Sequence, residues 1–175
     1  MMYEAKAFLS SHRATAVCSR EFARLTESIV AGARTLARDN VDGPPTFRQA
    51  PERCIVQLGP VALTVAWLRN GSDTPGDGQL MAIVWRGVIA PRGDHSPERL
   101  GMRRVPPTPV AIWEETLTAQ AESEATWVWR VEKDDHAELA SPALAAKCLA
   151  QLQRAYEACA SESDGELSRT SGETA

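Results

Sequence analysis

The densest group of residues able to do acid–base or metal chemistry is the tripeptide Asp134-Asp135-His136. A carboxylate beside a histidine can tune an acid–base pair or contribute to a metal site. Adjacent residues seldom converge on one ion, however, and no second histidine or cysteine stands at ligand spacing from this tripeptide. We therefore expect a turn that leads into the following helix, and we assign no catalytic residue and no metal site.

A second candidate is Glu115, the one carboxylate expected to share a sheet face with bulky apolar residues such as Trp113. Burial would raise the pKa of its carboxyl group, as a general acid requires. The alternative places it at a sheet edge with the carboxylate in solvent. Asp73 and Asp77 lie in a turn-rich loop and do not match the spacing of a calcium-binding loop. Because no phosphate-binding loop, dinucleotide fingerprint or nucleophile elbow occurs, we expect no cofactor.

Composition restricts the class of protein further. The chain has 175 residues, a size that suits one domain with a substantial core. A net charge of -4 argues against nucleic-acid binding, which normally needs a basic surface. No segment approaches the roughly 18 apolar residues of a membrane span. The four cysteines lie far apart and read as reduced thiols, which favours the cytoplasm. Arginine-rich, alanine-rich usage suggests a bacterial source.

The hydrophobic pattern predicts an α+β domain over residues 15–160. Apolar residues at three- and four-residue steps predict helices over residues 15–39 and 142–160, the second starting at Ser141-Pro142. Alternating runs predict an antiparallel sheet of about five strands, over residues 53–58, 61–69, 79–89, 110–119 and 124–132. A short helix is expected over residues 97–104, which gives the order α-β-β-β-(short α)-β-β-α. Residues 1–14 are expected to be weakly ordered, residues 41–52 to form a linker, and the acidic tail 161–175 to be disordered.

The alternation divides the sheet into two faces. The bulky face is expected to lie under both long helices and to hold Val61, Leu63, Val65, Trp67, Met81, Ile83, Trp85, Ala111, Trp113, Leu117, Trp127, Trp129 and Val131. Tryptophans on such a face normally fill a core. The alternative is an apolar ligand pocket lined by Trp67, Trp85, Trp113, Trp127 and Trp129.

The opposite face carries smaller apolar residues and a few charges, and it is too apolar for a fully solvated surface. We expect it to bind a protein partner or a second copy of the chain through Leu68, Leu80, Val84, Arg86, Ile112, Glu114, Val128 and Arg130. Within this set, Arg86, Glu114 and Arg130 would form a cross-strand charge ladder. The ladder would either fix the alignment of two chains at an interface or form a solvated ion pair.

The predicted order of elements, the size and the acidity resemble the chaperone fold of type III secretion effectors, over residues 15–160. The resemblance implies a dimer that holds an extended segment of a partner; no functional residue is carried over from it. The sequence therefore predicts a non-catalytic protein-binding or assembly module. A small apolar-ligand binder is the alternative, and a small enzyme using Glu115 or His136 is the third hypothesis.

Overall fold

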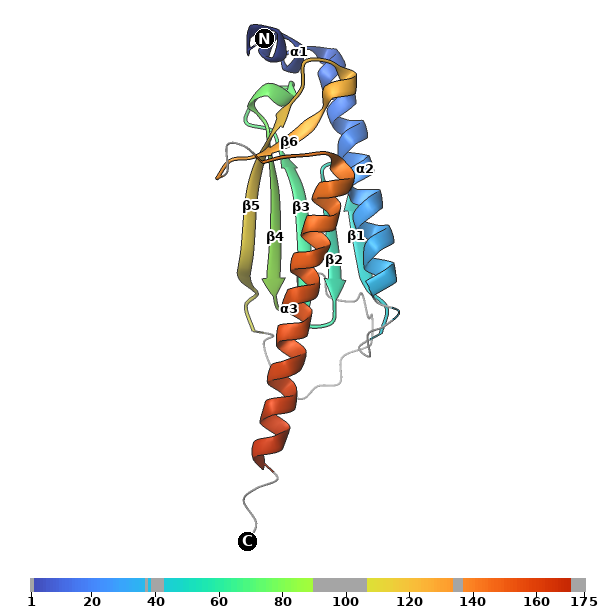
Figure 1. The fold of residues 1–175 in the computed structure, drawn as a ribbon, viewed down its shortest axis with the longest axis vertical. Helices are drawn as coiled ribbons and strands as arrows, with labels where there is room; N and C mark the ends of the chain where they lie inside the picture. Colours follow the sequence, from blue (N-terminus) through green and yellow to red (C-terminus); the bar gives the residue numbers. More distant parts are fainter. Residues whose placement is uncertain (1, 37, 39–42, 90–106, 134–136, 171–175) are drawn as a thin grey trace, which may run out of the picture.

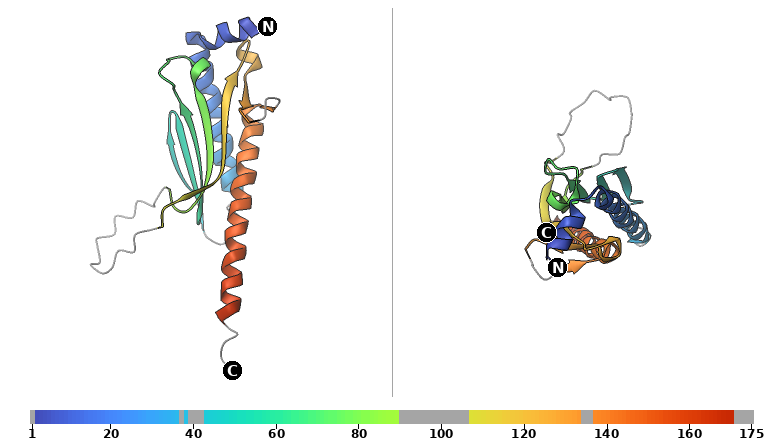
Figure 2. Two further views of the ribbon diagram at one scale, coloured as in Figure 1. Left: turned by 90° about the vertical axis from the view of Figure 1, so that its left-hand side faces the viewer. Right: turned by 90° about the horizontal axis from the view of Figure 1, so that it is seen from above.

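The protein is an α+β domain in which one antiparallel sheet lies against two long helices. The computed structural model describes residues 2–36, 38, 43–89, 107–133 and 137–170, with the backbone alone for residues 2–5 and 163–170. Helices α1 (Met2–Leu9) and α2 (His12–Leu36) precede the sheet, and α3 (Ser141–Thr170) follows it. Both long helices lie on the same side of the sheet (Figures 1 and 2). The predicted fold class is confirmed.

The sheet has seven strands in chain order, each antiparallel to its neighbour. The strands are β1 (Thr46–Ala50), β2 (Arg53–Leu58), β3 (Val61–Leu68), β4 (Gln79–Arg86), β5 (Val110–Gln120), β6 (Val128–Val131) and β7 (Glu138–Leu139). Two of them were not predicted. The first, β1, lies in the expected linker and is held by its pairing with β2, and β7 has only two residues. Short 3-10 turns, η2 (Pro75–Asp77) and η3 (Glu124–Thr126), precede β4 and β6.

Two glycines shape the lower end of the sheet. Gly59 has a φ of 53° and forms the β2–β3 turn with Pro60. Gly87 follows β4 with a φ of 124°, and a Cβ atom there would lie 3.0 Å from the Cα atom of Pro109. Gly87 therefore permits both the positive φ and the close approach of the Pro109 backbone.

The helices bury the stripes that their periodicity predicts. Phe22, Leu25, Ile29 and Ala33 of α2 are all buried. Helix α2 begins three residues before its predicted start at residue 15, and α3 continues ten residues past its predicted end at residue 160. None of the helices in the described part of the chain is long and apolar enough to cross a membrane. The predicted helix over residues 97–104 lies outside the described residues.

The core between helices and sheet contains most of the predicted bulky face. Val61, Leu63, Val65, Trp67, Leu117, Trp127, Trp129 and Val131 are buried there. Trp129 packs against two other indoles, with ring centroids 5.7 Å from Trp67 and 5.6 Å from Trp127. Tilted and edge-on contacts at this separation are favourable beyond simple burial.

The predicted orientation of β4 is wrong. Residues that pair directly across two strands point to the same face, and Leu63, Val65 and Trp67 pair with Val84, Ala82 and Leu80. All three β4 partners are fully buried under the helices. It follows from the alternation of side chains that the other β4 residues, Met81, Ile83 and Trp85, lie on the opposite face.

The reason is steric. Helix α3 crosses the sheet over β3 and β4. Small and medium side chains on β4, such as Ala82 and Val84, let the helix approach the sheet closely, whereas a large indole beneath it would hold it away.

Candidate functional site

The feature that stands out is the face of the sheet turned away from α2 and α3, called here the uncovered face. Among the described residues, no helix lies over it (Figure 2). Its central residues on β2, β3 and β4 are Ile55, Ala62, Thr64, Ala66, Leu68, Met81, Ile83 and Trp85. Most of these side chains are partly exposed, and Leu68 is 36% exposed. Apolar side chains, one of them a tryptophan, thus make up the middle of a solvent-facing surface.

Trp85 is held in place on this face. Its indole N–H donates a hydrogen bond to the hydroxyl oxygen of Thr64, 3.1 Å away on the neighbouring strand. Trp85 also pairs with Ala62, which is fully buried. The indole is therefore fixed by a polar contact on one side and a small neighbour on the other, an arrangement that lowers the entropy lost when a partner binds.

The upper end of the uncovered face is hollowed. An open depression of about 620 Å³ lies between the β1–β2 turn and the end of β3. Ala50, Arg53, Ala66 and Leu68 are among the residues that line it. Two of these are alanines, so the hollow arises where small side chains replace large ones on the face.

Charged residues lie at the margins of the uncovered face. Arg48 on β1 and Arg53 on β2 are exposed on one side, and Glu114 on β5 is exposed on the other. At the β6–β7 corner, the guanidinium of Arg130 donates a hydrogen bond of 2.6 Å to Glu138. An apolar centre with a polar rim is the usual anatomy of a protein interface.

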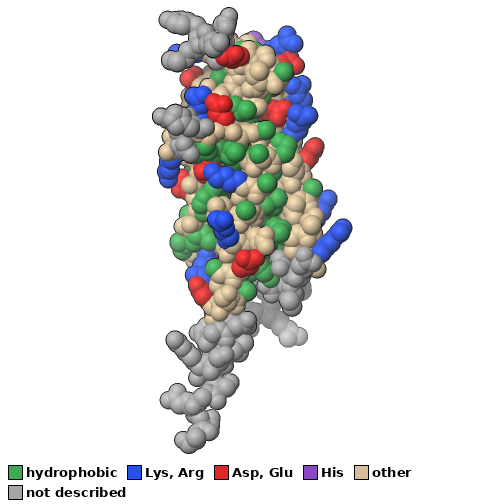
Figure 3. Space-filling model, viewed as in Figure 1, with side chains coloured by type: hydrophobic (Ala, Val, Ile, Leu, Met, Phe, Trp, Pro, Cys, Tyr) green, Lys and Arg blue, Asp and Glu red, His purple; other side chains and the backbone are tan. Residues whose placement is uncertain are grey.

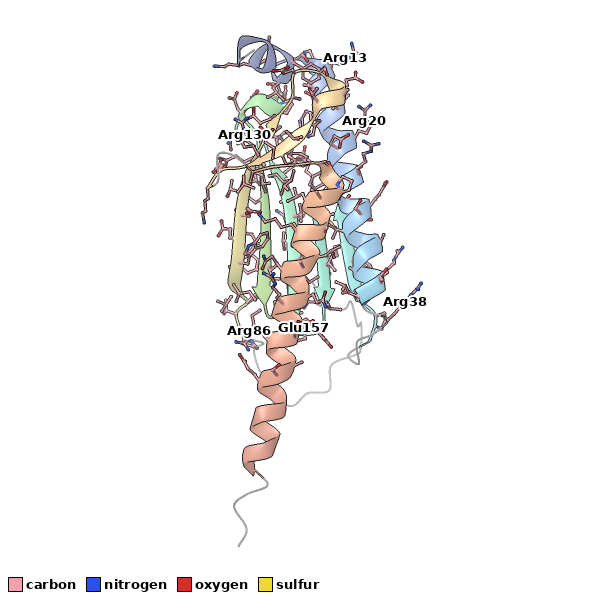
Figure 4. All side chains as sticks on the ribbon, in the orientation of Figure 1. Arg13, Arg20, Arg38, Arg86, Arg130 and Glu157 are labelled. Atoms are coloured by element: carbon pink, nitrogen blue, oxygen red, sulfur yellow. The ribbon has the colours of Figure 1, made fainter. Side chains whose placement is uncertain are left out.

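The predicted charge ladder does not form. Arg86 lies on the helix-bearing side and makes an ion pair with Glu162 of α3. Figure 4 shows Arg86 low on the molecule and Arg130 near the upper end, far apart along its long axis. Glu114 pairs across strands with Ile83 instead. The ladder was wrong because the β4 orientation that placed Arg86 on the same face was wrong.

The other predicted interface residues divide into two groups. Leu68 and Val128 lie on the uncovered face, and Ile112 is 48% exposed in β5 beside a register shift between Val84 and Trp85. The prediction was wrong for Leu80 and Val84, which are fully buried beneath the helices and belong to the core. Met81, Ile83 and Trp85 take their place on the face.

The predicted tryptophan-lined pocket is not assembled by these side chains. Trp67, Trp127 and Trp129 pack against one another, Trp113 is half-buried on the helix side, and Trp85 lies on the other face. The cleft beside Trp67, between α2 and the β3–β4 loop, has a volume of about 20 Å³. That is room for one water molecule rather than for an organic ligand.

Glu115 lies on the helix side, as predicted, but its carboxylate is paired with a lysine. The ammonium of Lys147 on α3 donates a hydrogen bond of 2.6 Å to its Oε1 atom. The side chain of Glu115 is 12% exposed, and its Oε2 atom is buried without a hydrogen-bond partner. The pair joins β5 to α3.

A buried polar chain that the sequence reading missed ties both long helices to the sheet. The indole N–H of Trp129 donates a 3.0 Å hydrogen bond to Ser141 Oγ, and this hydroxyl donates a 2.8 Å bond to Glu21 Oε2. Arg24 donates to the other oxygen of the Glu21 carboxylate, 3.1 Å away. The signal was present: Glu21 stands among the apolar stripe positions of α2 and is only 7% exposed.

A second buried polar group, Gln57, secures the lower end of the sheet. Its side-chain amide donates to the carbonyl oxygens of Gly59, Val61 and Gly87, and its carbonyl accepts from the backbone N–H of Ile89. These contacts connect the β2–β3 turn to the segment that leaves β4.

Asp134, Asp135 and His136 lie outside the described residues. In the part of the chain that is described, no three His, Cys, Asp or Glu side chains come together as metal ligands would. On the helix-bearing side, hydrophobic and charged side chains are mixed (Figure 3), and neither sign of charge dominates.

Comparison with known proteins returned no match. No protein-family model, no curated protein and no solved structure is significantly similar to this chain.

Proposed function

We propose that this chain is a protein-binding or assembly module and that the uncovered face of its sheet is the docking surface. One observation supports this most directly. The helices of the described part of the chain cover one face of the sheet, and the other face presents Ile83, Met81 and an oriented Trp85 at its centre.

Physical chemistry favours an occupant for such a face. Removing apolar surface from water contributes about 25 cal/mol per Å². Contiguous apolar surface on a folded chain usually marks a contact with another macromolecule. Tryptophan and methionine are also enriched at the cores of interfaces. The pattern of Trp85 and Met81 inside a charged rim fits that description.

The test is to place a charge at the centre of the face. Ile83→Asp should weaken association by about 30-fold or more, because a central contact typically contributes about 2 kcal/mol. Ala146→Asp is the matched control, since Ala146 is exposed on α3, on the other side of the molecule. Thermal unfolding of each variant checks that it remains folded.

Sedimentation velocity should be run on purified chain and on a fluorescent fusion in an extract of the source cells. We expect a particle larger than one chain in at least one sample, reduced to a single chain by Ile83→Asp and unchanged by Ala146→Asp. A single chain in both samples contradicts the proposal. So does a larger particle that survives Ile83→Asp.

A further inference from the structure

We infer that the occupant of the uncovered face is a second copy of this chain, related by a two-fold axis parallel to the strands. The inference rests on the proposed function and adds the partner and its orientation. It is carried by the order of side chains across the sheet.

One row of directly paired residues crosses five strands of the uncovered face. From β1 to β5 it reads Arg48, Ile55, Thr64, Ile83, Glu114. The row begins with a cation and ends with an anion, has isoleucine at the second and fourth positions, and has threonine at the centre. It is therefore self-complementary when its order is reversed.

A two-fold axis that runs along the strands, in the plane between two sheets, reverses this order and keeps each row at its own level. Arg48 of one copy then faces Glu114 of the other, and this happens twice by symmetry. Ile55 faces Ile83, and Thr64 lies at the axis. Isologous contacts of this kind are the most common way for identical chains to associate, and aligned sheets pack face to face at about 10 Å.

The neighbouring rows are compatible with this arrangement. One row below, the order is Thr46, Gln57, Ala62, Trp85, Ala111, so the indole of Trp85 faces Gln57 of the other copy and small Ala62 lies at the axis beside it. One row above, the order is Ala50, Arg53, Ala66, Met81, Thr116, so the aliphatic part of Arg53 meets Met81.

The other two-fold arrangement of the faces is disfavoured by charge. An axis perpendicular to the strands at the level of this row would place Arg48 on Arg48 and Glu114 on Glu114. Facing like charges repel and suppress such an arrangement. The charge pattern therefore selects the axis parallel to the strands.

The surface is large enough for a dimer. Five strands spaced about 4.8 Å apart, with about eight residues each at 3.3 Å, cover roughly 650 Å². A stable interface typically buries about 800 Å² on each partner. Val128 and Arg130 of β6 continue the same face beyond β5 and can add to this area.

The decisive experiment reverses the charges. The dissociation constant of the purified chain should be measured by sedimentation equilibrium for Arg48→Glu, for Glu114→Arg and for the double variant. Each single reversal creates two like-charge contacts and should weaken the dimer about tenfold or more. The double variant should recover the wild-type constant to within about threefold.

A mixture adds a result that misfolding cannot imitate. Chains carrying Arg48→Glu should pair with chains carrying Glu114→Arg more tightly than either variant pairs with itself. Equal dissociation constants for all charge variants overturn the two-fold arrangement, while the proposed function stands if Ile83→Asp still disperses the assembly. Purified wild-type chain that stays monomeric up to about 100 µM, where even weak dimers form, overturns the second-copy assignment. The extract experiment then decides the proposed function separately.

Discussion

Replacing Ser141 with alanine should be among the most damaging small substitutions in this protein. The hydroxyl of Ser141 accepts a hydrogen bond from Trp129 and donates one to Glu21. It is 1% exposed, so water cannot take its place in the folded chain. Ser141→Ala therefore leaves two buried polar atoms without this partner, the indole nitrogen of Trp129 and the Oε2 atom of the Glu21 carboxylate.

The magnitude follows from these two orphaned groups. Each unsatisfied buried group costs about 1–3 kcal/mol, and a charged one costs more. With partial relaxation of Glu21 toward Arg24, we expect a loss of about 3 kcal/mol in the free energy of unfolding. Trp129→Phe removes the donor instead and should cost about 2 kcal/mol, partly by leaving a cavity. Because the two residues share one chain of hydrogen bonds, the double variant should cost less than the sum.

Chemical denaturation monitored by far-UV circular dichroism measures these free energies. Ser161→Ala is the matched control, because Ser161 is an exposed serine of the same helix whose hydroxyl donates only to the carbonyl of Glu157. Its loss should change stability by less than about 0.5 kcal/mol. If Ser141→Ala costs no more than Ser161→Ala, or if the Ser141 and Trp129 effects add exactly, the proposed chain of hydrogen bonds is refuted.

Three further predictions concern packing, thiol ionisation and thiol accessibility. Gly78→Ala should lower the free energy of unfolding by about 2–4 kcal/mol in thermal unfolding, because the new Cβ would lie 2.1 Å from a ring carbon of Trp67. Gly76→Ala is its control, because the nearest neighbour of a Cβ there is 3.6 Å away. Equal losses for the two variants would contradict the explanation. Burial raises the pKa of the thiols from an ordinary 9.0 to about 12 for Cys18, about 11 for Cys54 and about 12 for Cys148. Since the unfolded thiols ionise first, their contribution to stability is complete below pH 9 and is lost as the pH rises from 9 toward 12, so the denaturant midpoint should fall over that range. With Ellman's reagent at pH 8, the half-buried Cys159 should react before denaturation and the three buried thiols only after it; rapid reaction of all four would refute the burial.

The sequence predicts the layers of this fold because long helices repeat their stripe many times. Helix α2 places Phe22, Leu25 and Ile29 on one side over several turns. The single buried carboxylate on that side, Glu21, does not obscure the repeat. The start of α3 at Ser141-Pro142 could also be predicted, because a serine cap followed by proline depends only on these neighbouring residues. A two-residue strand such as β7, or a strand like β1 that is held by pairing with β2, offers no comparable repeat.

The composition of the uncovered face was harder to predict for a related reason. In β4, one set of alternating residues is Met81, Ile83 and Trp85, and the other is Leu80, Ala82 and Val84. Both sets are apolar, so alternation separates them without indicating which one faces the helices. That choice depends on how closely α3 approaches β4, which is a property of the packed molecule. Trp85 was consequently assigned to the core, although it is the most prominent side chain of the candidate site.

Helix α3 also has a consequence for how the chain comes apart. Its 30 residues correspond to about 45 Å, whereas an eight-residue strand spans only about 27 Å. The C-terminal turns consequently project past the sheet (Figure 1). These projecting turns include Gly165, which lowers helix propensity. A helical segment of only a few turns is marginally stable when it packs against no other element. Amide deuterium uptake should therefore begin in these projecting turns and advance along α3 toward the buried Leu152. The order of exchange along the helix would then report how local opening spreads from its C-terminal end.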